Sequence, residues 1–97
     1  MTEIELRPLD FLLLEELLKG RNLGGNLHIT LDVTRPYTNE RLRTIADYEL
    51  VERVGPNENV GLYQITDKGR AALEYQDEYD EIDDFDAFIE EQLNTQF

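Results

Sequence analysis

TNERLRTIADYELVERVGPNENVGLYQITDKGRAAL, residues 38–73, decides the fold class, because its hydrophobic periodicity changes twice along its length. The first part continues a helix predicted over about residues 34–48, in which Thr34 suits the cap and Pro36 the first turn. LVERV and VGLYQIT then alternate as two strands around the polar turn GPNEN. TDKGRAALEY begins another helix, with Thr66 or Asp67 as its cap. The stretch is therefore predicted as a helix, a β-hairpin and a helix.

Two further helices are predicted upstream of this stretch. RPLDFLLLEELLKG places Leu9, Leu13 and Leu17 on one helical face, and Gly20 can end that helix. NLGGNLHITLDV is predicted as a loop followed by a short helix with Asn26 as its cap. The order helix, helix, helix, hairpin, helix predicts an α+β, mostly α fold of the winged helix-turn-helix type over residues 1–75, with residues 76–97 as an acidic amphipathic C-terminal helix or tail.

Residues 8–75 resemble winged-helix transcription regulators, in particular the phage phi-H repressor-like proteins of halophilic archaea. The matching positions follow the pattern of recognition helix, wing and final helix: Asn39, Arg41, Leu42, Ile45, Leu50, Val51, Tyr63, Ile65, Thr66 and Gly69. The resemblance implies a cytoplasmic DNA-binding regulator that is usually dimeric. Glu49 departs from the pattern, since it stands where the family has a glycine that ends the helix in the left-handed conformation. A non-glycine residue there costs about 1 kcal/mol, so Glu49→Gly is predicted to be neutral or stabilising.

The predicted recognition helix offers a polar face for DNA. With Leu42 directed at the core, the opposite face carries Tyr37, Glu40 and Thr44, flanked by Arg41 and Arg43. Arginine can bind guanine, glutamate can accept from cytosine N4, and threonine or tyrosine can contact a thymine methyl group or a phosphate. The same side chains could instead form ordinary exposed pairs, such as Arg43 with Asp47 or with Glu40, and Tyr37 could pack over the preceding helix.

Other DNA-binding candidates lie at the edges of this surface. Arg35, in the first turn of the helix, is placed for a backbone phosphate, and Asn39 belongs to the family pattern given above. Asn57 and Asn59 in the wing turn can donate hydrogen bonds to phosphate, whereas Glu58 between them repels it. The alternative for the turn is a polar hairpin tip with no DNA contact.

The charge of the chain is strongly acidic and unevenly distributed. The 97 residues include 22 acidic and 9 basic side chains, for a formal net charge of −13, and residues 76–97 hold nine of the acids and no base. Lysine is scarce beside arginine. This composition is what a protein needs to stay hydrated in molar salt, which favours a halophilic source. The alternative is an ordinary acidic protein with a solvated tail.

The C-terminal tail has an amphipathic helical pattern that needs a partner for its apolar side. The apolar residues recur at spacings of three and four: Ile82, Phe85, Phe88, Ile89 and Leu93. Three arrangements remain open. The helix could pack on the body beside the first helix, it could pair with its twin and form a homodimer, or it could be a flexible acidic arm that competes with DNA for the basic face.

The sequence contains no recognisable catalytic or metal-binding constellation. Cysteine is absent, His28 is the sole histidine, and we find no nucleophile with a base and no phosphate loop. We therefore expect no enzyme activity, no metal, no cofactor and no small-molecule ligand. No segment is apolar and long enough for a membrane span or a secretory signal, so a cytoplasmic protein is expected.

The leading hypothesis is a sequence-specific double-stranded DNA-binding transcription regulator, acting as a repressor, with the helix over about residues 34–48 in the major groove. Its expected partners are DNA and a second copy of the chain. The alternative is a winged-helix protein-interaction module without specific DNA binding. This alternative would be favoured if the Arg35, Arg41 and Arg43 side chains were held in ion pairs with acidic residues. A third hypothesis, an acidic tail that imitates DNA, rests on the tail alone.

Overall fold

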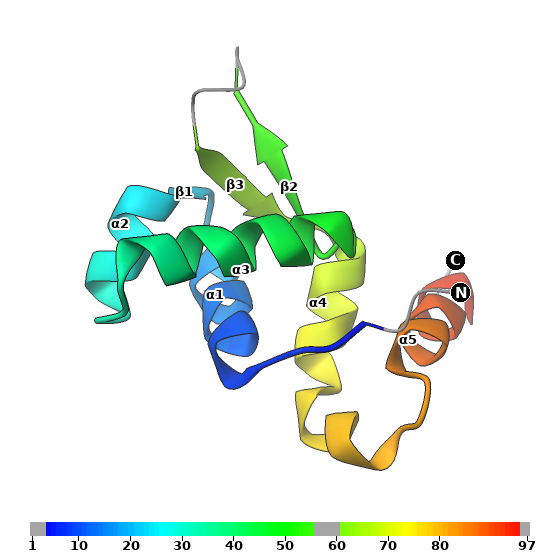
Figure 1. The fold of residues 1–97 in the computed structure, drawn as a ribbon. Coiled ribbons are helices and arrows are strands. Elements are labelled where there is room, and N and C mark those ends of the chain that lie inside the picture. Colours follow the sequence, from blue (N-terminus) through cyan, green and yellow to red (C-terminus); the bar gives the residue numbers. More distant parts are fainter. Residues whose placement is uncertain (1–3, 56–60, 96–97) are drawn as a thin grey trace.

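The structure is a computed structural model that describes residues 4–55 and 61–95. The elements follow in the order α1 (Pro8–Leu18), β1 (Asn22–Leu23), α2 (Gly24–Thr30), α3 (Arg35–Asp47), β2 (Val51–Val54), β3 (Leu62–Ile65), α4 (Asp67–Glu74), the 3-10 helix η1 (Gln76–Glu81) and α5 (Phe85–Thr95). In Figure 1, α3 crosses over α1, the β2–β3 hairpin projects from this layer, and α4 and α5 lie to one side. This arrangement confirms the predicted winged helix-turn-helix.

The sheet has three antiparallel strands in the order β1-β3-β2. The predicted hairpin pairs Val51 with Ile65 and Val54 with Leu62. β1 was not predicted, because two residues carry no periodicity; it pairs with β3 on the other side. The chain then passes directly from β1 into α2, so this helix begins at Gly24 and the expected start with Asn26 as the cap is wrong. The Gly24 N–H donates to the carbonyl of Gly61 (3.2 Å), which ties the start of α2 to the wing.

The turn between α3 and β2 is joined closely to the start of α4. Glu49 has φ +66°, as predicted from the missing glycine. The Thr66 hydroxyl donates to the Glu49 carbonyl (2.6 Å) and accepts from the Gly69 N–H (3.0 Å), so Thr66 caps α4 while holding the turn. A Cβ atom on Gly69 would lie 2.0 Å from the carbonyl oxygen of Leu50. A side chain at this position would therefore push α4 away from the wing.

The core lies between α1, α3, the sheet and α4, and its fully buried side chains include Leu13, Leu14, Leu27, Leu42, Ile45 and Leu50. Most of these belong to the apolar faces that the sequence predicted. None of the helices within the described ranges is long and apolar enough to cross a membrane.

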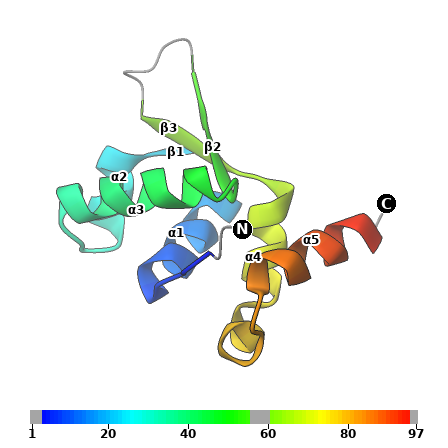
Figure 2. The same ribbon diagram turned by 45° about the vertical axis from the view of Figure 1, so that its right-hand side comes forward.

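The C-terminal helix α5 packs on α4 of the same chain, as both views of the ribbon show (Figures 1 and 2). Phe85 is 3% exposed and Ile89 is fully buried, while the apolar side chains of Ile82, Phe88 and Leu93 are partly buried against the core. The Lys68 ammonium bridges the two helices, with Nζ 2.6 Å from an Asp86 oxygen. The expectation that Phe85 and Ile89 form a dimer interface is therefore wrong.

The segment before α5 also reaches the first helix. The Tyr79 ring in η1 meets Phe11 of α1 and Phe85 of α5 edge-on, at centroid distances of 5.7 and 5.0 Å. Its hydroxyl accepts from the Leu6 N–H (2.8 Å). Of the three arrangements considered for the tail, the structure has the one in which it packs on the body.

Candidate nucleic-acid interface

The outward face of α3 is formed by Glu40, Arg43 and Asp47, whose side chains are exposed, and Arg35 is exposed in the first turn at one edge of this face. The buried side consists of Thr38, Arg41, Leu42 and Ile45. The helix is thus rotated from the predicted orientation, in which Leu42 marked the centre of the buried face. The true centre lies between Leu42 and Arg41, so that Glu40 and Arg43 are turned fully outward.

Arg41 does not contribute to this face, and its predicted contact with DNA is wrong. Its side chain is buried (6% exposed) and forms two hydrogen bonds with Asp10 of α1, from Nε to Oδ1 (2.8 Å) and from Nη2 to Oδ2 (2.7 Å). Asp10 is fully buried and also accepts from the Arg7 N–H (2.8 Å). The hydrogen bonds with Asp10 raise the pKa of Arg41, against the opposing effect of burial. Arg41 therefore anchors α3 to the start of α1.

The other two arginines of α3 are available to a ligand. Within residues 4–55 and 61–95, neither Arg35 nor Arg43 forms an ion pair or a side-chain hydrogen bond. The helical pairs considered for Arg43, with Glu40 or Asp47, are thus not formed. Thr44 differs from these residues, since its hydroxyl donates to the Glu40 carbonyl of its own helix (3.0 Å).

Two arginines that the sequence analysis did not single out flank α3. Arg7 is exposed beside Tyr37, and a hydrogen bond with that side chain raises the pKa of Arg7. Arg53 lies on β2, where its Nη2 donates to the Tyr63 hydroxyl (3.0 Å) and its guanidinium lies 5.5 Å from the ring centroid. Strict alternation from the buried Val51 would place Arg53 on the inner face of the strand, so the sequence pattern does not predict its exposure. The candidates at the tip, Asn57 and Asn59, lie outside the described residues.

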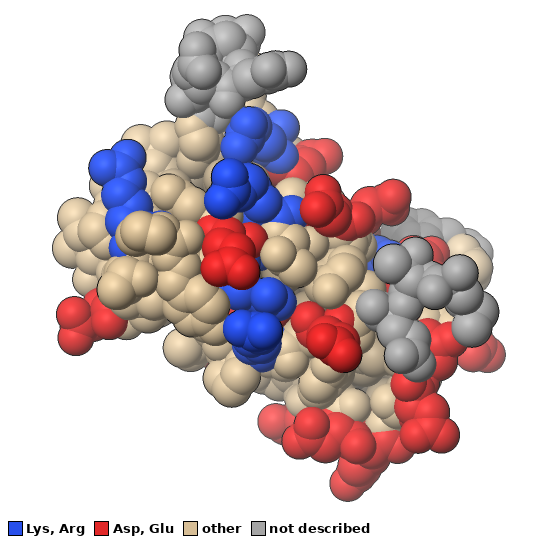
Figure 3. Space-filling model, viewed as in Figure 1, with Lys and Arg blue, Asp and Glu red and all other residues tan. Residues whose placement is uncertain are grey.

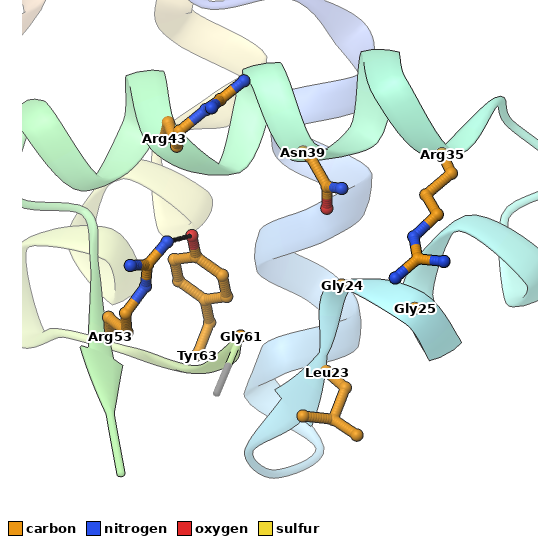
Figure 4. A pocket seen from close by; sticks show the side chains of 9 residues that line it. All are labelled: Leu23, Gly24, Gly25, Arg35, Asn39, Arg43, Arg53, Gly61 and Tyr63. Carbon is orange, nitrogen blue, oxygen red and sulfur yellow. Dashed lines mark hydrogen bonds between the residues drawn. The ribbon is translucent and has the colours of Figure 1, made fainter. Parts of the chain in front are cut away.

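A hollow of about 350 Å³ opens between α3, the start of α2 and the wing. Figure 4 shows Arg35 and Asn39 extending from α3 toward the start of α2, with Arg43 at the rim and Arg53 joined to Tyr63 on the wing side. Glycines supply part of the wall, and a Cβ on Gly24 would come within 2.6 Å of the Asn39 side-chain oxygen. Among the residues that the structure describes, none that lines this basic hollow is acidic.

Charge is separated over the surface of the molecule. In Figure 3, lysine and arginine side chains gather over α3 and the base of the hairpin, with single acids among them. Aspartate and glutamate gather instead toward the end formed by η1 and α5. The net charge of −13 therefore does not describe the face that carries α3.

The described residues contain no group of three or more histidine, cysteine, aspartate or glutamate side chains placed to hold a metal ion. His28 is half-buried in α2.

Comparison with known proteins gives matches in structure alone: no family model and no curated protein matches the chain. Three solved structures of Lactococcus lactis ZitR, described as a zinc-responsive MarR family member, superpose with TM-scores of 0.63, 0.65 and 0.63 at 17%, 16% and 17% identity. They cover 97%, 100% and 98% of this chain. The chain spans 64% and 66% of the two mutant ZitR chains and 76% of the third. At this identity the likeness supports the winged-helix fold.

Proposed function

We propose that the chain is a sequence-specific double-stranded DNA-binding transcription regulator, acting as a repressor, with α3 in the major groove. The observation that carries the proposal is the exposed surface of α3, where Arg43 faces outward and Arg35 lies at one edge, and neither forms an acid pair with a described residue. In helix-turn-helix proteins the second helix of the motif enters the major groove, and α3 occupies that position after α2. The resemblance to phage phi-H repressor-like proteins points in the same direction.

The roles of the side chains follow from their places on the helix. Arg43 and Glu40 are turned fully outward, so they are the candidates for reading base edges, guanine O6 and N7 by arginine and cytosine N4 by glutamate. Tyr37 and Thr44 lie at one edge and Arg35 and Asn39 at the other. We assign these edges to phosphates and to positioning of the helix.

The acidic composition is consistent with DNA binding at high salt. Counterion release contributes less as salt rises, so binding must rely on hydrogen bonds and fit. At low salt, the acids gathered toward η1 and α5 would repel a long duplex while the basic face attracts it. A halophilic, cytoplasmic regulator accounts for both the composition and the local charge.

A homodimer remains part of the proposal, because regulators of this size read two half-sites. Since Phe85 and Ile89 are buried in the core, the contact uses either the partly buried Ile82, Phe88 and Leu93 of the predicted set or another surface. Leu12 and Leu18 on α1 are exposed apolar side chains that offer one.

The alternative, a protein-interaction module, depended on all three arginines being held in acid pairs. Arg41 is held by Asp10, whereas Arg35 and Arg43 are not held. This difference favours DNA as the partner.

The test is a binding selection from a pool of random duplexes at about 0.2 M and about 2 M potassium chloride. Enrichment of one palindromic motif at both salts is the expected result and would support a specific, dimeric, salt-adapted regulator. Sequence-blind binding that disappears with salt, or no binding, would overturn the proposal in favour of an interaction module.

A further inference from the structure

We infer that the basic hollow is a binding site for a single phosphate group, and that in the DNA complex it holds one phosphate of the backbone. The second half of this inference rests on the proposed function. The first half does not, because the hollow has its own chemistry whether or not α3 reads a duplex.

The charge of the hollow is the first argument. Three guanidinium groups from two elements, Arg35 and Arg43 of α3 and Arg53 of β2, line one opening of about 350 Å³. Of the lining residues within 4–55 and 61–95, none is acidic, although acids outnumber bases 22 to 9 in the chain. Guanidinium forks match the geometry of phosphate oxygens and form short, charge-assisted hydrogen bonds with them. A tetrahedral oxyanion is therefore the ligand class that suits this set.

The neutral groups in the hollow are the second argument. The Tyr63 hydroxyl accepts from Arg53 Nη2, which fixes that guanidinium on the wing side and leaves the hydroxyl proton to donate. The Asn39 side chain supplies an amide at the opposite wall, toward the start of α2 (Figure 4). Both can donate to a phosphate oxygen.

The space in the hollow is the third argument. A Cβ built on Gly25 or on Gly61 meets no atom within 4 Å, so the wall is open at both glycines. A phosphate of the DNA backbone carries a sugar on each side, so it needs a binding site that is open to solvent. An enclosed pocket would admit a free phosphate ion alone. The hollow lies directly beside the outward face of α3, so a phosphate held there would fix the register of the helix against the bases.

The experiment places a carboxylate in the hollow by Gly25→Asp and compares it with Gly25→Ala. Because a Cβ at residue 25 meets nothing within 4 Å, both variants are expected to fold, and an acid in the first turn of α2 is favourable with the helix dipole. Thermal unfolding of both variants checks this. Two probes are used on each protein: inorganic phosphate, followed by the NMR signals of the arginine Nε–H groups, and duplex DNA.

The expected result has three parts. Inorganic phosphate shifts the signals of Arg35 and Arg53 in the wild type and in Gly25→Ala, and not in Gly25→Asp, while Arg43 stays at the rim for the bases. Gly25→Asp weakens binding to all duplexes alike by about tenfold, as for loss of one charge-assisted contact. For Gly25→Asp, the slope of log affinity against log salt concentration is shallower by about 0.9, and the preferred DNA sequence is unchanged.

The two inferences fail in different ways. If phosphate shifts the Arg35 and Arg53 signals but no duplex binds, the phosphate site stands and the proposed function fails. If duplexes bind but Gly25→Asp matches Gly25→Ala in affinity and salt slope, the assignment of the hollow to a backbone phosphate is overturned and the proposed function stands. If inorganic phosphate leaves the arginine signals of the wild type unmoved, the phosphate site itself is overturned. If neither probe binds, both are overturned.

Discussion

Replacing Arg41 by methionine tests whether this arginine stabilises the fold or contacts DNA. The substitution keeps an apolar stem in the core and removes the guanidinium from Asp10, whose carboxylate is fully buried. Asp10 then retains the Arg7 N–H as a hydrogen-bond donor and loses both bonds from Arg41. An uncompensated buried charge of this kind costs about 3–5 kcal/mol. Since a domain of this length has a stability of about 5–15 kcal/mol, a large part of the free energy of unfolding would be lost.

Urea unfolding followed by circular dichroism measures this loss, with Arg43→Met as the matched control two positions along the same helix. Arg43 is exposed, so its replacement is expected to change the stability by no more than about 0.5 kcal/mol. The two variants are expected to differ in the opposite sense in DNA binding. Arg43→Met weakens binding, whereas the folded fraction of Arg41→Met binds DNA like the wild type. Equal stability of the two variants, or loss of binding by fully folded Arg41→Met, would refute the assignment. The pair Asp10→Leu with Arg41→Met should regain most of the lost stability, because both buried charges are removed together.

Three further substitutions test the packing around α3 and α4 by the same unfolding measurement. Gly69→Ala should destabilise the fold by about 3 kcal/mol or more, because its Cβ would lie 2.0 Å from the Leu50 carbonyl oxygen. Gly25→Ala, whose Cβ would lie in open space, is the control. A small effect at residue 69 would show that α4 can shift freely. Glu49→Gly should stabilise by up to about 1 kcal/mol, since it relieves φ +66°, and a lower stability would contradict this reasoning. Thr38→Val should stabilise by about 1 kcal/mol, because the buried Thr38 hydroxyl has no hydrogen-bond partner among the described residues; destabilisation would mean that the hydroxyl is satisfied.

The parts of the fold that depend on neighbouring residues could be predicted from the sequence. The hairpin is set by alternation around a polar turn, and the start of α4 by Thr66, whose hydroxyl accepts from the N–H three residues on. The strain at Glu49 also followed from a local pattern, a missing glycine at a helix end. Each of these features is decided within a few residues, where periodicity and capping rules apply.

The parts that depend on distant residues could not be predicted in this way. Asp10 and Arg41 are 31 residues apart, and Arg41 has no acid one turn away in its own helix, so the local pattern predicts it on the exposed face. The rotation of α3 follows from the same pair. The sequence predicts an amphipathic helix in the tail, but its pattern does not identify the surface on which the apolar side packs. In the structure that surface is α4 of the same chain. Arg53 could not be predicted because its place beside α3 depends on how the wing folds back over that helix, which the pattern of β2 does not show.

The most direct test of the central claim, that the outward face of α3 reads bases, is a selection from random duplexes with Arg43→Gln and with Arg70→Gln. Both arginines are exposed, but Arg70 lies on α4, away from the proposed interface. The account predicts that Arg43→Gln changes or relaxes the selected motif at one position in each half-site, while Arg70→Gln selects the wild-type motif. Selection of the same motif by both variants, with the same affinity, would contradict the account.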